Sequence, residues 1–414
     1  MRENDVIVIG AGLAGLVAAA AAASRGKSVL VLTKGAAAIS IGGGAIDVLG
    51  YDAEGRSVAS PLAGIETLPE DHPYRRIGVQ RVTEALEFFQ KIAVEAGYPY
   101  SGNIGHTQWL PTAVGTLKPS CLVPGSMSPL LLSAAEEVVV VGFSRLKDYY
   151  PEWIIQGLRQ NLSASKRYQG VTLDAGLADG RDITALDVAR WLDSESGRQQ
   201  CIAQIRQQIP AGSIVLIPPV LGTKPDCLTV KQLEQQTGCH FIETTGLPPA
   251  VTGLRLRTML VSQLKKNQVK IIEQANVTGA LVESGYCRAV TTSNVDRERH
   301  YYGKAFVLAT GGFFGGGLQS GAGWAGESIY KLPMSVPSAQ EEWGAADLFS
   351  PAGQPFARFG LAVDTSLRPI DRQGLPLLEN VYIAGRNLAG YDYCLEKSGN
   401  GVAVASGYLA GSSA

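Results

Sequence analysis

The sequence predicts an α/β protein with a Rossmann-like, FAD/NAD(P)-binding type of domain and a second α/β domain inserted into it. First, an apolar β-branched run at 5–9, an Ala-rich helical stretch at 13–24 and a second apolar run at 28–32 make a βαβ unit. Second, a new set of strands opens at 138–141, far from that unit. Third, 414 residues favour two domains over one core.

We predict that the nucleotide-binding domain is discontinuous. It comprises residues 1–119 and 253–414, and the inserted α/β domain covers residues 120–252. The insert contains buried strands at 138–141 and 213–217, with helical patterns between them. Because no Gly-x-Gly-x-x-Gly follows the first of these strands, the insert is not expected to bind a second nucleotide.

Composition narrows the possible partners. The formal net charge is −1 without any block of Lys or Arg, so nucleic acid is not an expected partner. The six cysteines form no Cys-x-x-Cys pair, so neither a zinc site nor an iron–sulfur site is predicted. The apolar run 6–23 follows Glu3 and Asp5 and is broken by glycines, unlike a signal peptide or a membrane span. We therefore expect a soluble chain.

The first candidate binding site is the loop between the first strand and the first helix. Its glycines have separate tasks: Gly10 permits a tight turn, Gly12 lets a phosphate approach the backbone, and Gly15 lets the helix pack on the strand. Leu13 and Ala14 open the helix, whose free N–H groups and dipole favour an anion. The motif in this context predicts nucleotide binding.

The end of the second strand lacks the acid that commonly grips an adenosine ribose. Thr33 and Lys34 stand there instead. The ligand then either has no adenosine half, as in FMN, or has its ribose held by another group. A lysine meeting the 2′-phosphate of NADP is a third explanation, which the rest of the chain disfavours.

Three further Gly-rich loops follow predicted strands or open the last helix. Loops at the carboxyl edge of a parallel sheet are where α/β folds bind ligands, and a helix N-terminus there would stabilise an anionic reduced flavin ring. The candidate cofactor contacts in these loops are Ser40, Gly42, Gly43 and Gly44, then Thr310 and Gly311, and finally Gly385, Arg386, Gly399, Asn400, Gly401 and Val402.

This order of motifs resembles the glutathione-reductase and fumarate-reductase type of flavoprotein. Over essentially its whole length the chain is also similar to the family of B subunits of anaerobic glycerol-3-phosphate dehydrogenases. The strings that carry this second resemblance include His72–Tyr74, Gly115–Leu117, Val140–Gly142, Leu247–Pro249, Gly253–Leu256, Phe313–Leu318 and Leu367–Pro369.

The resemblance implies a flavin-bearing subunit of a three-part enzyme that oxidises sn-glycerol 3-phosphate to dihydroxyacetone phosphate in anaerobic glycerol catabolism. It implies two partners, a second flavin-bearing catalytic subunit and an iron–sulfur subunit that anchors both to the membrane. Electrons would pass to quinone and then to fumarate or nitrate. The expected location is cytoplasmic, peripheral on the inner face of the cell membrane through a partner.

The chain departs from the wider flavoprotein pattern at one more position. Where those enzymes have Gly-Asp, with the Asp on the ribityl hydroxyls, this chain has Gly385-Arg386. With Thr33 in place of the ribose acid, both usual carboxylates are absent. The sequence therefore predicts FMN, with FAD as the alternative.

Candidate catalytic groups are few. Arg255, Arg257 and Arg368 are candidates for holding a substrate phosphate, and His106 for a general base, but salt-bridged arginines and an incidental histidine explain them as well. No acid/base constellation stands out, which fits a subunit that relays electrons while its partner oxidises the alcohol. Two alternatives remain open: a self-sufficient flavin oxidoreductase on another substrate, and a flavin-free scaffold subunit.

Overall fold

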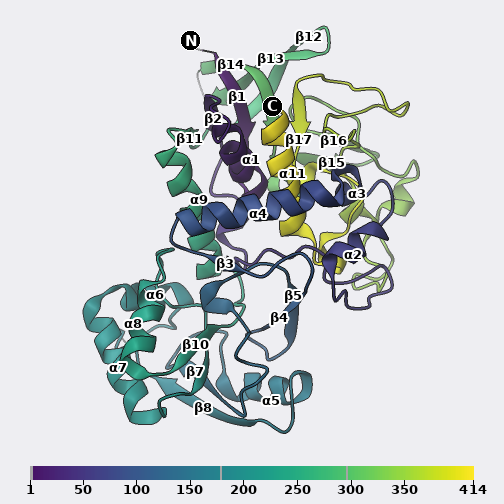
Figure 1. The fold of residues 1–414 in the computed structure, drawn as a ribbon. Helices are drawn as coiled ribbons and strands as arrows, with labels where there is room; N and C mark the ends of the chain where they lie inside the picture. The colour runs from purple at the N-terminus through teal and green to yellow at the C-terminus, as the bar shows by residue number, and fades with distance from the viewer. Residues whose placement is uncertain (1–2, 178–179, 295–296) are drawn as a thin grey trace.

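The computed structural model describes residues 3–177, 180–294 and 297–414 as two bodies, one built on a mixed sheet and the other on a parallel sheet (Figure 1). The upper body in that view contains both ends of the described chain. The lower body is formed by the middle of the chain, as the prediction of an inserted α/β unit requires.

The main sheet has seven strands in the order β11-β2-β1-β14-β13-β12, with β17 pairing beside β14. The parallel part of the sheet consists of β11, β2, β1, the second half of β14, and β17. The antiparallel part is a meander of β12, β13 and the first half of β14. The bounds are β1 Asn4–Ile9, β2 Val29–Leu32, β11 Lys270–Ile272, β12 Val277–Glu283, β13 Tyr286–Asn294, β14 Arg297–Leu308 and β17 Val381–Ile383.

Close helix packing supports this sheet. Helix α1 (Leu13–Ala23) lies against α11 (Gly399–Ser413), and α9 (Val251–Lys266) and α4 (Val79–Glu95) pack nearby. A side chain at Gly407 would place its Cβ 2.3 Å from the Ala14 carbonyl oxygen. Alanines on one helix and glycines on the other therefore let the two backbones approach closely.

The second sheet is fully parallel, in the order β10-β9-β7-β8. Its core is separate from that of the main sheet and reaches Ala113, ahead of the predicted insert. The boundaries 1–119, 120–252 and 253–414 stay a prediction. The elements are β7 Glu137–Phe143, α5 Pro151–Asn161, β8 Arg167–Leu173, α6 Ala185–Asp193, α7 Glu195–Gln208, β9 Ile214–Ile217, α8 Leu228–Thr237 and β10 His240–Glu243.

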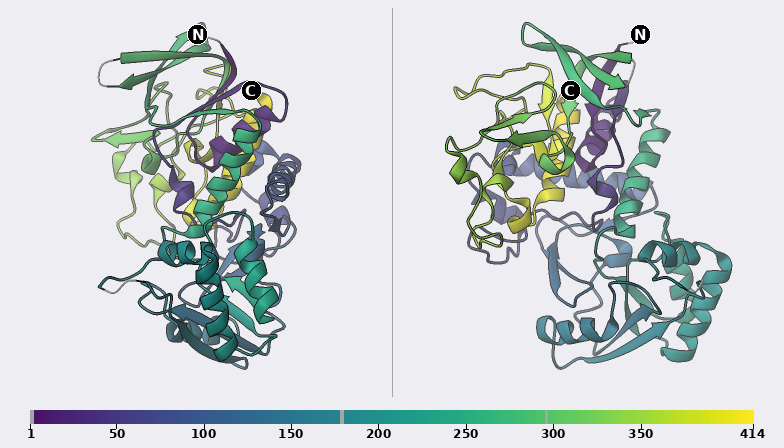
Figure 2. Two further views of the ribbon diagram at one scale, coloured as in Figure 1. Left: turned by 90° about the vertical axis from the view of Figure 1, so that its left-hand side faces the viewer. Right: turned by 180° about the vertical axis from the view of Figure 1, so that it is seen from behind.

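Shorter elements complete the chain. They are α2 Pro61–Glu66, α3 Pro73–Ile77, β3 Tyr100–Ser101, β4 Gln108–Pro111, β5 Leu117–Ser120, β6 Val123–Pro124, β15 Leu318–Gly321, β16 Trp324–Glu327 and α10 Tyr393–Glu396. The segment after β16 is mostly irregular and lies on the opposite side of the main body from α9 (Figure 2). Among the described residues, none of the helices has the length and apolarity that a bilayer crossing requires.

Candidate functional site

Four of the predicted loops begin at the same edge of the main sheet. Ile9 is in register with Leu32 on one side and Leu308 on the other, and Leu308 is in register with Ile383. The loops that follow β1, β2, β14 and β17 therefore leave the sheet side by side. This carboxyl edge is where parallel α/β sheets bind ligands.

The three glycines of the first loop separate into two kinds. A Cβ at Gly10, where φ is +108°, would lie 2.2 Å from the Ala309 carbonyl oxygen, and one at Gly15 would lie 2.0 Å from the Gly10 oxygen. Packing of the chain explains both. At Gly12, among described residues beyond its own turn of chain, a Cβ would come within 4 Å of the Ala37 Cβ alone, at 3.9 Å. The space above Gly12 is thus free for a ligand, next to the unpaired N–H groups of the first turn of α1.

Thr33 joins the ends of two neighbouring strands. Its buried backbone donates to the Ile272 oxygen (3.0 Å) and accepts from the Ala275 N–H (2.9 Å), and its hydroxyl donates to the Gly35 oxygen (2.8 Å). The hydroxyl oxygen keeps its acceptor capacity. Lys34, directly after it, is exposed.

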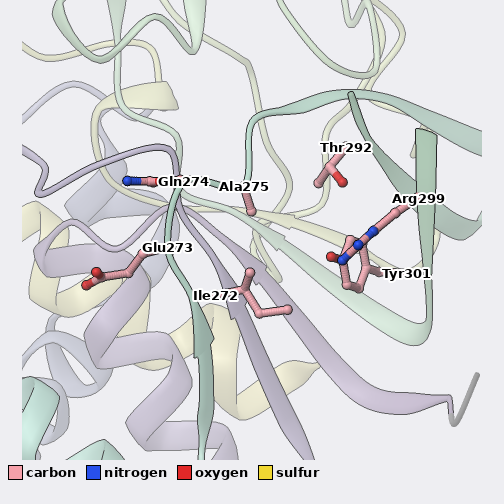
Figure 3. A pocket seen from close by; sticks show the side chains of 7 residues that line it. All are labelled: Ile272, Glu273, Gln274, Ala275, Thr292, Arg299 and Tyr301. Carbon is pink, nitrogen blue, oxygen red and sulfur yellow. The ribbon is translucent and has the colours of Figure 1, made fainter. Parts of the chain in front are cut away.

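An open cavity of about 440 Å³ adjoins Thr33 through Ala275. Figure 3 shows Thr292, Arg299 and Tyr301, from β13 and β14, on one side and the end of β11 on the other. Arg299 is exposed and forms no ion pair within the described part of the chain. The lining residues are Ile272, Glu273, Gln274, Ala275, Thr292, Arg299 and Tyr301.

The glycines of the second Gly-rich loop also have different roles. At Gly44 φ is +78°, and a Cβ there would lie 2.8 Å from the Thr252 Cβ, so this glycine is needed for packing against α9. The Gly43 carbonyl accepts a hydrogen bond from the Thr252 hydroxyl (2.9 Å). Among the described residues, a Cβ at Gly43 would meet no atom of another segment within 4 Å, and one at Gly42 would make only ordinary contacts. Ser40 bonds within its own turn. Gly42 and Gly43 are the members of this loop that a ligand can approach.

A buried asparagine that the sequence did not reveal joins the loops after β14 and β17. Asn387 accepts the Gly311 N–H (2.9 Å) and donates to the Thr310 hydroxyl (3.0 Å). The predicted contacts Thr310 and Gly311 are thereby held against the Gly385 turn. Its only sequence signal is its position directly after Gly385-Arg386.

Arg386 carries the clearest sign of a missing acceptor. Its Nη2 donates to the Ala357 oxygen (3.1 Å), and its guanidinium lies over the rings of Tyr393 (4.0 Å) and Tyr391 (5.0 Å). Its Nη1 is buried without a partner among the described residues. Leaving a buried charged donor unpaired is costly, so a phosphate or hydroxyl oxygen of a bound flavin fits here.

The start of α11 is only partly available to a ligand. The Gly401 N–H donates to the Asp47 oxygen (2.8 Å), and a Cβ at Gly401 would lie 2.2 Å from the Tyr74 hydroxyl. Asn400 donates to the Ala45 oxygen (2.7 Å), and Val402 is fully buried. Gly401 is therefore fixed by the chain's own packing, and its amide is not free as the sequence suggested.

A buried polar cluster just before α11 was not predicted. The His72 Nδ1 accepts the Tyr74 N–H (3.1 Å), so the neutral ring carries its proton on Nε2 and donates it to Glu396 (3.1 Å). Ser398 also donates to Glu396 (2.8 Å). Burial alone would raise the pKa of Glu396, but these hydrogen bonds outweigh it and lower the pKa. The cluster fixes the segment that leads into α11.

A second polar pair lies on the other side of that junction. Lys118, from β5, forms an ion pair with Asp47, whose other carboxylate oxygen is buried without a partner in the described residues. The Asp47 backbone oxygen accepts the Gly401 N–H. This pair connects the β4–β5 hairpin to the start of α11, and no sequence motif marked it.

Arg255, the first catalytic candidate, is buried in an ion pair. It is buried in α9 and reaches the second sheet, where it donates to both carboxylate oxygens of Glu243 (2.6 and 2.8 Å) and to the Gly222 oxygen (2.7 Å). Burial alone would lower the pKa of Arg255, but the Glu243 charge outweighs it and raises the pKa. Arg255 therefore joins the two bodies, and because the side chain is buried and ion-paired it is closed to a substrate phosphate in this arrangement.

The other candidates are not gathered at the sheet edge by any described contact. Arg368 pairs with Asp364 and Glu379, and Arg257 with Glu273 (3.2 Å). His106 is exposed on a turn. Within the described residues, no group of three or more His, Cys, Asp or Glu side chains is arranged to hold a metal ion. No described contact joins the predicted catalytic candidates to one another, and their catalytic roles stay a prediction.

Comparisons with known proteins agree with this geometry. Residues 5–402 match the family described as FAD binding domain. The B subunit of a probable anaerobic glycerol-3-phosphate dehydrogenase from Halobacterium salinarum is 30% identical over 100% of this chain and 98% of its own length. The B subunit of the anaerobic glycerol-3-phosphate dehydrogenase of Vibrio cholerae is 27% identical, covering 99% and 96%.

Among solved structures, the open conformation of a flavocytochrome c3 fumarate reductase matches with a TM-score of 0.45 and 10% identity, covering 100% of this chain and 78% of that one. The family match confirms the predicted flavoprotein fold and the flavin. It gives no support to the choice of FMN over FAD.

Proposed function

Because the chain belongs to the FAD binding domain family and to the family of B subunits of anaerobic glycerol-3-phosphate dehydrogenases, we propose that it is a flavin-bearing subunit that takes part in oxidising sn-glycerol 3-phosphate to dihydroxyacetone phosphate. One observation carries the cofactor part of this proposal. The loops of four parallel strands leave one edge of the sheet, where the backbone at Gly12 has free space and where the Nη1 of Arg386, in the loop after β17, has no partner among the described residues.

The cofactor we propose is FAD, in place of the FMN that the sequence suggested. The cavity beside Thr33 offers room for an adenosine half, and Arg299 and Tyr301 supply flat groups along one wall. The Thr33 hydroxyl can bond a ribose hydroxyl where a carboxylate is usual. Heating the pure protein and weighing the released ligand tests this choice. Stoichiometric FMN would contradict it.

The residues of this chain bind and orient the cofactor. A bound flavin would supply the acceptor for a hydride from the substrate carbon. The first turn of α1 and the backbone at Gly12 would hold its phosphate, and Arg386 would donate a charge-assisted hydrogen bond to a neighbouring oxygen. The base that takes the substrate hydroxyl proton is expected from a partner, because His106, the candidate base in this chain, is exposed and no described contact brings it to the sheet edge.

The proposed partners are a second flavin-bearing catalytic subunit and an iron–sulfur subunit. The relatives' names, which designate one subunit of an enzyme, support an assembly. We further propose that the complex lies on the cytoplasmic face of the cell membrane through the iron–sulfur subunit. Electrons would leave to quinone and then to fumarate or nitrate.

Anaerobic bleaching of the flavin band near roughly 450 nm tests the division of labour, since the flavin supplies the chromophore. The purified chain should bind flavin yet be bleached by glycerol 3-phosphate slowly or not at all. Adding the second flavin subunit should restore reduction of a soluble dye. Rapid, complete bleaching without a partner would contradict the relay role. A pure, folded chain without visible absorbance would favour the flavin-free scaffold.

A further inference from the structure

Large apolar side chains are exposed together on the irregular side of the main body. Phe349 is 91% exposed, Phe314 87% and Leu348 75%. Soluble proteins expose single apolar residues often, but gathered aromatic side chains mark interaction sites. We define the apolar patch as Phe314, Leu348, Phe349, Phe356, Tyr393 and Leu395.

Contacts between distant segments link the parts of the chain that carry the apolar patch, apart from the turn that holds Phe314. Gln354 donates to the Leu348 oxygen (3.0 Å), and a Cβ at the adjacent Gly353 would lie 2.7 Å from the Leu395 side chain. Arg386 bonds the oxygen of Ala357, next to Phe356, and lies over the Tyr393 ring. The patch therefore borders the residue that we place at the cofactor.

The exposed area approaches what one partner buries in a specific complex. Taking roughly 200 Å² for a large apolar side chain, the six residues expose on the order of 700 Å² together. A standard interface buries about 800 Å² on each partner.

The charges around the apolar patch favour a protein over a membrane surface as its binding partner. Within residues 341–358, Glu341, Glu342 and Asp347 are exposed without ion pairs in the described chain, against one exposed cation, Arg358; the exposed Lys331 and Arg372 lie outside this stretch. A cytoplasmic membrane surface is negative and repels such a rim. A protein surface with an apolar centre and a basic rim is complementary to it.

We propose that the apolar patch and its acidic rim form the docking surface for the second flavin-bearing subunit. This inference rests on the proposed function and adds the place of contact. Docking there would cover the segment beside Arg386 and bring the partner next to the cofactor site. The patch would be buried in the complex and exposed only in the isolated chain.

The test is association of the purified, flavin-loaded chain with the purified second flavin subunit, measured by interferometry. Phe349→Ser and Leu348→Ser should each weaken binding by roughly tenfold or more, as central apolar contacts do. Trp153→Ser is the matched control, because Trp153 in α5 is 78% exposed at the far end of the molecule (Figure 1) and should leave binding unchanged. Glu341→Lys with Glu342→Lys should slow association and reduce its dependence on salt.

Unchanged flavin content in each variant shows that the fold is intact. Equal binding by the patch variants and the unaltered chain, or a loss confined to Trp153→Ser, would overturn the docking surface. So would binding of the isolated chain to vesicles of phosphatidylglycerol and phosphatidylcholine that Phe349→Ser abolishes, since a lipid would then be the occupant. No association by the unaltered chain would contradict the proposed function itself.

Discussion

Replacing Arg255 by Met should destabilise the protein strongly and leave substrate binding unaffected in the folded fraction. The substitution keeps an unbranched side chain of similar length but leaves Glu243 charged and fully buried. In the described part of the chain, the Ser126 hydroxyl (2.7 Å) and the Leu221 N–H (2.8 Å) alone would remain to bond that carboxylate. Arg255 would then be shown to join α9 to the second sheet.

The expected cost is about 3–5 kcal/mol, the range for removing one partner of a buried ion pair. This is a large share of a total stability of roughly 5–15 kcal/mol. Glu243→Leu should cost a similar amount, because Arg255 would then be the unpaired charge. The double variant should cost clearly less than the sum, since neither charge remains.

Urea unfolding followed by circular dichroism measures these costs, and Arg257→Met on the same helix is the control. Arg257 pairs with Glu273, whose side chain is largely exposed, so its loss should cost less than about 1 kcal/mol. Two results together would refute the structural account: an unfolding free energy of Arg255→Met within about 1 kcal/mol of the unaltered protein, and a raised KM for glycerol 3-phosphate in the complex. Arg255 would then be a substrate ligand.

Three further predictions follow from the site. Gly12→Val should abolish flavin binding in a folded chain, whereas Gly15→Val should prevent folding, because its Cβ would lie 2.0 Å from the Gly10 oxygen. Absorbance measures the flavin content and circular dichroism the fold. A Gly12→Val variant with a full content of flavin would contradict the role of this loop in binding phosphate. Asn387→Leu should leave the Gly311 N–H unpaired, cost about 1–3 kcal/mol in urea unfolding and lower the flavin content. The folded-state pKa of Glu396 lies below its ordinary value of 4.5, so its contribution to stability is present above that pH and is lost as the pH falls through the folded pKa. Glu396→Gln should therefore make Tm fall less steeply in this acid range. An unchanged pH profile of Tm would refute this prediction.

The sequence predicted the parts of the fold that local patterns specify. The β-branched runs at β1, β2, β7 and β9 are buried strands, and the Ala-rich stretch is α1. The amphipathic α4 was missed although its apolar positions recur with helical spacing. Long-range contacts could not be read at all. The pairing of Arg255 with Glu243 depends on how the two bodies meet, which no spacing along the chain encodes.

The same limit applies to the candidate site. Glycine-rich loops after strands were found from the sequence, but not which glycines serve packing and which serve a ligand. That distinction depends on neighbours from distant segments, such as Thr252 beside Gly44 or Tyr74 beside Gly401. Asn387 was missed because an asparagine after a glycine turn is common, and only its contacts to Thr310 and Gly311 reveal its role.

The choice between FMN and FAD shows why one substituted residue cannot decide a cofactor. The sequence argument rested on two missing carboxylates, at Thr33 and at Arg386, and only the one at Thr33 would contact an adenosine ribose. A single hydrogen bond contributes only about 0.5–1.5 kcal/mol net, or about 1.5–3 kcal/mol when one partner is charged. The hydroxyl of Thr33 recovers part of that, and the cavity beside it keeps room for an adenosine half. The helix N-terminus, the space at Gly12 and the unpaired Arg386 Nη1 are independent of Thr33. A carboxylate lost at one contact therefore weakens an adenosine site without removing it.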